Sequence, residues 1–264
     1  MTGPIFDTHA HYSSRAFDAD RFALLDSLPE KGVVGVCEQA THSGDAPRVL
    51  ELAHRYPWVY AAIGIHPESL LAPEDCGEEG PAPTVSVFGG DWAAEMKALA
   101  PSYDDPKVVA VGECGLDYHW PVPKDAQLAL FEAEIRLALE LDKPIIVHDR
   151  NAHADVYAKG IVHCYSGSAD DAVWLARQGL YFGFGGACTF KGAKRAAKAI
   201  AALPLEQIVL ETDCPYMAPE PVRGIRCDSS LIRYVGEYVA SVKGISPEEV
   251  FHQTAQNAKA VYQL

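Results

Sequence analysis

The stretch Ile5-Phe6-Asp7-Thr8-His9-Ala10-His11 joins an apolar segment to the pattern Asp-x-His-x-His. In an extended strand, residues two apart point to the same face, so Asp7, His9 and His11 would project together from one strand end. Two imidazoles so placed can hold a metal ion, and a nearby carboxylate can orient a ligand histidine through its other ring nitrogen. The stretch therefore predicts a metal-binding strand end with Asp7 behind the ligands. The alternative to a metal site is a solvent-exposed strand edge that carries three polar residues.

Eight short apolar segments, each followed by a helical pattern, occur along the 264 residues. Continuous apolar strands alternating with helices are typical of a parallel sheet buried on both faces. Eight such units in about 250 residues are typical of a (β/α)8 TIM barrel. We expect this α/β fold as a single domain over residues 1–264. A doubly wound open sheet is the alternative, but the chain has no G-x-G-x-x-G turn to support it. The expected strands are 4–7, 32–37, 59–65, 107–113, 143–148, 160–163, 179–184 and 207–211.

Helices are expected between the strands, where apolar residues recur at helical spacing and caps or glycine and proline stops delimit them. They are 18–28, 45–56, 124–141, 169–178, 191–203, 229–243 and the segment from 246 onward. Two regions are irregular. Residues 72–91 are rich in glycine, proline and acid and predict an inserted surface loop. The link 149–159 is shorter than the dozen or so residues that a crossover between parallel strands usually needs.

Composition limits the partners of this chain. A formal net charge of −14 argues against a protein that coats long or duplex nucleic acid. It does not exclude an enzyme acting on a phosphate chain end, because bound divalent cations can supply positive charge locally. Seven cysteines without a C-x-x-C pair indicate reduced thiols. With no signal peptide and no apolar run of membrane-spanning length, we expect a cytoplasmic monomer with no membrane partner.

Further polar side chains fall at the carboxyl ends of the expected strands, where (β/α)8 barrels build their active sites. In each strand the polar tip continues an inward apolar row: Glu113 follows Val111, and His148 follows Ile146. The same alternation turns Cys114, Cys164 and Cys214 toward the helices, as core thiols. Four histidines and two carboxylates suit two divalent ions bridged by a carboxylate, whereas a structural zinc site would be closed by four ligands, mostly Cys and His. The expected metal ligands are His9, His11, Glu113, His148, His163 and Asp213.

Together these motifs resemble the TatD family of metal-dependent deoxyribonucleases, from Phe6 to the last helix. The motifs are Asp7-Thr8-His9-Ala10-His11, Gly64-Ile65-His66-Pro67, Gly112-Glu113-Cys114-Gly115-Leu116-Asp117, His148-Asp149-Arg150, His163-Cys164-Tyr165-Ser166-Gly167 and Glu211-Thr212-Asp213-Cys214-Pro215-Tyr216. The resemblance implies a (β/α)8 barrel with two divalent ions (Mg²⁺, Mn²⁺ or Zn²⁺). One ion would be held by His9, His11, Glu113 and Asp213, and the other by Glu113, His148 and His163. It also implies cleavage of DNA from the 3′ end, with RNA as a substrate of some members.

Other residues receive supporting roles. We expect Asp213 to act as general base and His66 to hydrogen-bond the phosphate. Arg150 and Arg226 are candidate contacts to the substrate backbone. Asp117 would brace the loop after Glu113, and Glu211 would need a cationic partner inside the barrel. The chain departs from the family in Cys227 and Ser229, which stand where the family usually has Asn and Pro, so substrate contacts near that loop are in doubt.

The expected function is that of a TatD-like metal-dependent phosphodiester hydrolase, a 3′–5′ exonuclease on single-stranded DNA, with RNA as a further substrate. The alternative is a binuclear metallohydrolase of small esters, amides or lactones on the same barrel. Such enzymes often bridge their metals with a modified lysine on the fourth strand, where this chain has Glu113. A non-catalytic scaffold is a third reading, but it predicts an incomplete ligand set.

Overall fold

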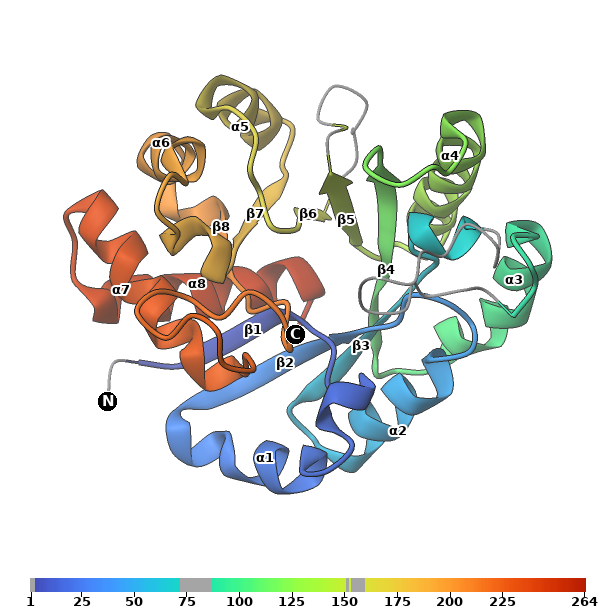
Figure 1. The fold of residues 1–264 in the computed structure, drawn as a ribbon, viewed down its shortest axis with the longest axis horizontal. Helices are drawn as coiled ribbons and strands as arrows, with labels where there is room; N and C mark the ends of the chain where they lie inside the picture. The colour runs from blue at the N-terminus through green and yellow to red at the C-terminus, as the bar shows by residue number, and fades with distance from the viewer. Residues whose placement is uncertain (1–2, 72–86, 151, 153–159) are drawn as a thin grey trace. The chain divides into compact units, whose positions relative to one another are not determined.

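The computed structural model describes residues 3–71, 87–150, 152 and 160–264. Eight strands alternate with helices and form one sheet in the order β1 to β8 (Figure 1). Neighbouring strands pair in parallel, for example β1 with β2 and β7 with β8. The (β/α)8 prediction is therefore confirmed. The strands are β1 (Ile5–Ala10), β2 (Val33–Gln39), β3 (Val59–Ile63), β4 (Val108–Asp117), β5 (Ile145–Arg150), β6 (Gly160–Val162), β7 (Tyr181–Phe184) and β8 (Ile208–Leu210).

All of the expected helices occur, with ends shifted by a few residues. They are α1 (Arg21–Ser27), α2 (Ala46–Arg55), α4 (Lys124–Glu140), α5 (Ala169–Arg177), α6 (Lys194–Ala202), α7 (Ile232–Lys243) and α8 (Pro247–Tyr262). Helix α3 (Trp92–Leu99) was not predicted; the Asp91 side chain caps it by accepting the Ala94 N–H at 3.0 Å. The predicted loop 72–91 and the short link 149–159 lie largely outside the described residues. Within those residues, no helix is long and apolar enough to cross a membrane.

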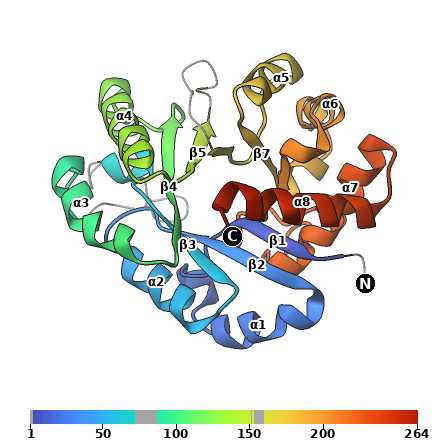
Figure 2. The ribbon, with the colours of Figure 1, turned by 180° about the vertical axis from the view of Figure 1, so that it is seen from behind.

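Contacts along the chain define two compact units, and each is described by itself. The first unit comprises residues 1–38 and 161–264, and the second comprises residues 39–160. The single domain expected over 1–264 stays a prediction. In the first unit α8 packs against β1, as both ribbon views show (Figures 1 and 2). The Tyr262 hydroxyl donates to the Thr8 carbonyl at 2.8 Å, and Asn257 Nδ2 donates to the Ile208 carbonyl at 2.7 Å. The last helix thereby holds the first and last strands of this unit.

In the second unit, side chains from α4 complete the strand ends. Gln127 accepts the Asp117 N–H and donates to the Asp117 carbonyl, both at 2.8 Å. Glu134 accepts the Ile65 N–H at 2.8 Å. A buried backbone amide without a partner would be costly, so these contacts hold the chain where β3 and β4 end. Gly115 allows a close approach of β4 to β5, because a Cβ there would lie 2.2 Å from the His148 carbonyl oxygen.

Candidate metal centre

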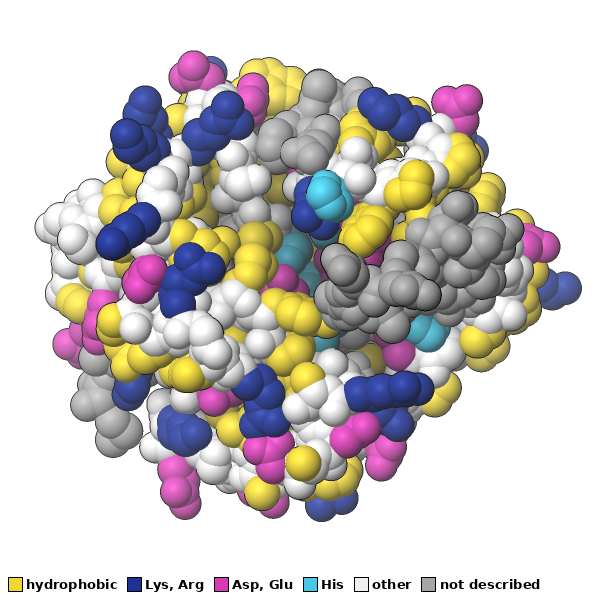
Figure 3. Space-filling view, in the orientation of Figure 1, with side chains coloured by type: hydrophobic (Ala, Val, Ile, Leu, Met, Phe, Trp, Pro, Cys, Tyr) yellow, Lys and Arg dark blue, Asp and Glu magenta, His cyan; other side chains and the backbone are white. Residues whose placement is uncertain are grey.

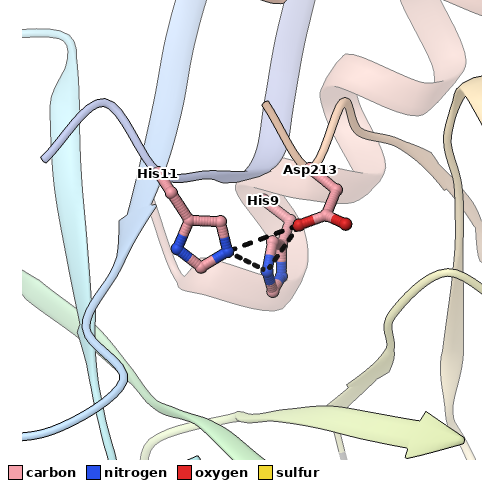
Figure 4. A group of neighbouring side chains, drawn as sticks. All are labelled: His9, His11 and Asp213. Carbon is pink, nitrogen blue, oxygen red and sulfur yellow. Dashed lines mark hydrogen bonds and ion pairs between the residues drawn. The ribbon is translucent and has the colours of Figure 1, made fainter. Parts of the chain in front are cut away.

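Three side chains meet where β1 and β8 of the first unit end. His9 Nε2 and His11 Nε2 lie 3.1 Å apart. Asp213 Oδ1 is 3.4 Å from His11 Nε2 and 3.8 Å from His9 Nε2 (Figure 4). His9 is completely buried, and the Asp213 side chain is 17% exposed. Their ligand atoms all lie within 4.8 Å of one another. This geometry brings together three of the six predicted ligands.

His163 joins the same group from the end of β6. Its ring stacks on that of His9 with 3.5 Å between centroids, and its Nε2 is 4.0 Å from Asp213 Oδ2. We call His9, His11, His163 and Asp213 the first-unit cluster. Glu211, expected to need a cationic partner, has its Oε1 3.0 Å from His163 Nδ1 and accepts the Cys164 N–H at 2.7 Å. Glu211 therefore lies behind the ligand candidate His163.

Cys164 departs from the strand alternation used to predict its orientation. Its φ of 47° interrupts the extended backbone, and the residue is only half-buried. Its Sγ lies within 4.8 Å of ligand atoms of His163 and Glu211. Cys114 and Cys214, by contrast, are fully buried, as predicted. The alternation argument thus fails at Cys164 because the strand has already ended at Val162.

The first-unit cluster has the donor set of a divalent metal site. Burial by itself raises the pKa of Asp213, but the hydrogen bond from His11 and the charges of the neighbouring histidines lower the pKa overall. Asp213 is therefore a carboxylate at neutral pH. Two ring nitrogens that face each other at 3.1 Å beside this carboxylate are both satisfied when they share one cation. The residues present fit a metal ion.

Asp7 contacts backbone and hydroxyl groups rather than an imidazole ring. It accepts the N–H groups of His9 at 3.2 Å and Thr212 at 3.0 Å, and hydroxyls of Thr212 and Ser229, both at 2.6 Å. Ser229 in turn lies 2.8 Å from the Tyr12 hydroxyl. Burial raises the pKa of Asp7 to about 7, although these hydrogen bonds oppose the shift. Asp7 thus joins the ends of β1 and β8 to Ser229, one of the positions that departs from the family.

A second group lies at the ends of β4 and β5 in the second unit. Glu113 Oε1 is 3.1 Å from His148 Nδ1 and 3.6 Å from His66 Nε2. The His66 and His148 rings meet edge to face, with centroids 4.3 Å apart. Asp117 Oδ2 lies 3.0 Å from His148 Nε2. We call His66, Glu113, Asp117 and His148 the second-unit cluster.

His148 is held between two carboxylates. Burial lowers its pKa, but the hydrogen bonds to Asp117 and Glu113 outweigh burial and raise the pKa to about 10. For Asp117 the effects are reversed. Burial raises the pKa of this carboxyl group, but the hydrogen bond and the charge of His148 outweigh burial and lower the pKa overall. If His148 binds a metal through Nδ1, its Nε2–H donates to Asp117, which selects the tautomer. The geometry therefore favours Asp117 for the histidine-orienting role that the sequence suggested for Asp7.

His66 lies among the candidate ligands, although we expected it at the substrate. Its Nδ1 accepts the Glu68 N–H at 3.2 Å, which leaves Nε2 facing Glu113. Glu68 was not singled out from the sequence. Burial raises its pKa, and the charge of His148 opposes that shift. The sequence feature that could have indicated Glu68 is Pro67, which starts a short helix (Pro67–Leu70) directly after His66. This helix keeps Glu68 close to the second-unit cluster.

The two predicted arginines lie in different surroundings. Arg150 Nη1, on an exposed side chain, is 3.9 Å from Asp117 Oδ2, beside the second-unit cluster. Arg226 donates to both oxygens of Asp20, at 2.8 and 2.6 Å, and to the Ala16 carbonyl at 2.9 Å. Its guanidinium also stacks on Phe17. Substrate binding by Arg226 stays a prediction, and it would compete with this ion pair.

Comparisons with known proteins agree with this geometry. The family described as TatD related DNase matches residues 6–263. The chain is 35% identical to the uncharacterized metal-dependent hydrolase YabD of Bacillus subtilis, over 98% of this chain and 99% of the relative. It is 27% identical to the 3′-5′ ssDNA/RNA exonuclease TatD of Erwinia billingiae, over 98% of this chain and 99% of that protein. The crystal structure of YJJV, a TatD homologue from Escherichia coli K12, superposes with a TM-score of 0.84 at 26% identity and covers 100% of both chains. The chain is therefore an enzyme and belongs to the TatD-related DNases, a family of metal-dependent hydrolases.

Proposed function

We propose that this enzyme removes nucleotides from the 3′ end of single-stranded DNA, with RNA as a further substrate. The observation that carries the proposal is the first-unit cluster, in which three imidazoles surround one carboxylate. Family membership supports a nuclease, and the similarity to the 3′-5′ ssDNA/RNA exonuclease of Erwinia billingiae supports the 3′–5′ direction. The net charge of −14 supports action at chain ends, because a wide basic surface for duplex DNA is not expected.

We propose two divalent ions per chain, Mg²⁺, Mn²⁺ or Zn²⁺. The proposed ligands are His9, His11, Glu113, His148, His163 and Asp213. Sharing of Glu113 between the ions, and the pairing of His163 with His148, follow from the family resemblance. When bound, such ions supply positive charge at a phosphodiester and lower the pKa of a water molecule.

The protein groups then have separate tasks. Asp213, a carboxylate at neutral pH, accepts a proton from the attacking water. His66 donates a hydrogen bond to a phosphate oxygen or, given its place beside Glu113, adds a ligand. Arg150 is the better-placed arginine for the substrate backbone, because Arg226 is paired with Asp20.

The test follows the shortening of single-stranded DNA labelled at its 5′ end, and the mononucleotides released from it, with added Mg²⁺ or Mn²⁺ and with chelator. We expect a ladder that shortens from the 3′ end in the wild type, and almost none with chelator or in His148→Ala. His252→Ala, an exposed histidine on α8, is the matched control and keeps wild-type activity. Undiminished release by His148→Ala would contradict the proposal.

A substrate panel separates the nuclease from the alternative hydrolase. Single-stranded DNA, RNA, blunt duplex DNA and small esters, amides and lactones are assayed under identical metal conditions. We expect single strands to be cut faster than blunt duplex. Turnover of a lactone or amide without any release of nucleotides would favour the small-molecule hydrolase.

We also propose that the enzyme is a cytoplasmic monomer. Six cysteines lie in the described part of the chain, and none of them forms a disulfide there, which suits a reducing compartment. Sedimentation of the purified protein and fractionation of cells that express it test the two statements. A stable dimer or a secreted product would overturn them.

A further inference from the structure

We infer that Tyr216 and Arg223, with Arg223 stacked on Phe190, form a subsite for the nucleotide next to the phosphate being cut. Tyr216 would stack on the base and Arg223 would hold a backbone phosphate. This inference rests on the proposed nuclease function and lies entirely within the first unit.

Tyr216 stands at the start of the loop that leaves the first-unit cluster. Its N–H donates to the Asp213 carbonyl at 3.0 Å, so a single turn separates it from the candidate general base. The Tyr216 side chain is 45% exposed, which is unusual for a large aromatic group beside a buried cluster. The Cys227 N–H donates to the Pro215 carbonyl at 3.0 Å and closes the loop at its far end. The tyrosine is therefore presented on a loop anchored at both ends.

The turn that follows β7, Gly186–Thr189, packs against this loop. A Cβ on Gly186 would lie 1.8 Å from the Met217 carbonyl oxygen, so only glycine allows the two backbones to meet. The Thr189 hydroxyl oxygen accepts the Glu220 N–H at 2.9 Å. Phe190 follows directly, and the Arg223 guanidinium carbon lies 3.8 Å from the centre of its ring. Phe190 thus supports Arg223 from a segment that is itself fastened to the loop.

Arg223 and Arg226 differ in the hydrogen-bond partners of their guanidinium groups. The guanidinium group of Arg226 donates hydrogen bonds to Asp20 and to the Ala16 carbonyl. Arg223 is exposed and makes no ion pair with any residue that the structure describes. The ring of Phe190 lies against the guanidinium group, whose N–H donors bond to no residue that the structure describes and can therefore bind phosphate oxygens in pairs. In a chain of net charge −14, such an exposed arginine marks a place for an anion.

The surrounding surface agrees with a nucleic-acid contact. Figure 3 shows lysine and arginine side chains among hydrophobic ones on the side where Figure 1 draws α5, α6 and α7. Exposed basic residues follow Phe190 along the chain, namely Lys191, Lys194 and Arg195. A cationic path with an aromatic platform is the usual arrangement for single strands, and it tolerates any base sequence. We therefore expect little sequence preference in cleavage.

The test measures binding and cleavage separately. Binding of a fluorescein-labelled single-stranded oligonucleotide is followed by anisotropy with chelator present, and KM and kcat are measured with Mn²⁺. We expect Tyr216→Ala and Arg223→Ala each to weaken binding about tenfold and to raise KM, while kcat changes little. Arg223→Ala should also reduce the salt dependence of binding by about one phosphate contact. Tyr216→Phe should restore binding, because the ring and not the hydroxyl does the stacking.

Lys259→Ala is the control, since it removes the same charge from an exposed site on α8 of the same unit. Hydrolysis of methyl p-nitrophenyl phosphate reports on the cluster without a nucleotide, and all four variants should keep it. The inference is overturned if Tyr216→Ala and Arg223→Ala bind and cleave DNA like the wild type, or if Arg226→Ala alone weakens binding. A wild type that hydrolyses the ester but neither binds nor cleaves DNA overturns the nuclease proposal together with this subsite.

Discussion

The two clusters use the same residue types but balance their charges differently. In the first-unit cluster, imidazole nitrogens of His9 and His11 face each other at 3.1 Å beside Asp213. In the second-unit cluster, His148 lies between Asp117 and Glu113, at 3.0 and 3.1 Å, and its pKa is raised to about 10. In the described part of the chain, the first cluster therefore has no cation of its own beside Asp213, whereas in the second the protonated His148 offsets one of the two carboxylate charges. Metal binding at the second cluster must displace that proton.

The difference follows from what the strand ends supply. The first cluster gathers three histidines around one carboxylate, while β4 contributes both Glu113 and Asp117 to the second. An extra carboxylate favours the charged imidazole of His148. The two clusters should therefore respond differently to substitution, to metal ions and to pH.

The largest effect is expected when the first cluster loses its carboxylate. Asp213→Asn should reduce kcat for single-stranded DNA about a thousandfold, because it removes both the candidate base and a ligand charge. Kinetics should be combined with a count of bound metal by calorimetry. His252→Ala, at an exposed site on α8, provides the control. A variant that keeps both kcat and metal content would show that the first-unit cluster is not the reaction centre.

The pH dependence of stability should separate the two units. A histidine with a raised pKa stabilises the fold fully below its ordinary pKa of 6.5, and this contribution is lost as the pH rises toward about 10. For His148 we expect a loss of about 3 kcal/mol at most, after a discount for its partial exposure. Buried Asp7 and Glu38 have pKa values raised to about 7, so the first unit loses stability earlier, between about pH 4 and pH 7.

Urea unfolding of the metal-free protein at a series of pH values measures both windows. His148→Gln should flatten the free energy of unfolding above pH 7 and leave the lower window as it is. Glu38→Gln should reduce the slope in the lower window only. If His148→Gln left the upper window unchanged, the ion pair of the second cluster would not exist in solution.

A smaller effect is expected for the carboxylate behind His148. Asp117→Asn should lower the affinity for one of the two metal ions about 10- to 100-fold, because the amide no longer selects the metal-binding tautomer. Titration calorimetry with Mn²⁺ would show one weakened site and one unchanged site. Asp7→Asn provides the comparison, since Asp7 contacts the backbone of His9 and not its ring. Equal weakening of both sites by Asp117→Asn would refute the assignment.

The smallest effect concerns Ser229, a position where the chain departs from its family. Ser229→Ala removes hydrogen bonds to the buried Asp7 and Tyr12 and should cost about 1–2 kcal/mol. Thermal unfolding should fall by about 2–6 °C. Tyr12→Phe also removes the acceptor of the buried Ser229 N–H, at 2.8 Å, and should cost a similar amount. An unchanged melting temperature in Ser229→Ala would show that Asp7 finds another partner.

Local patterns predicted a large part of this molecule. Apolar strands alternating with capped helices placed all eight strands, because burial on both faces requires such runs whatever the contacts are. Alternation within β1, β4 and β5 predicted His9, Glu113 and His148 as inward ligand candidates, and each lies in a group of possible metal ligands. Asp213 lies beyond the end of β8, at a φ of 58°, so strand alternation does not account for its position. The alternation failed at Cys164, where a left-handed residue follows the strand.

What the sequence determined by itself is the family, the (β/α)8 fold and the ligand candidates, since each depends on periodicity and on residue types at strand ends. The tertiary structure alone decided which carboxylate faces which histidine. In the structure Asp117 contacts the ring of His148, and Glu211 contacts the ring of His163. Asp7 accepts hydrogen bonds from backbone amides, and Arg226 donates to Asp20. These pairings join residues up to 206 positions apart in the chain. A charged or hydrogen-bonding side chain finds its partner only when folding brings such distant groups within about 3 Å of each other.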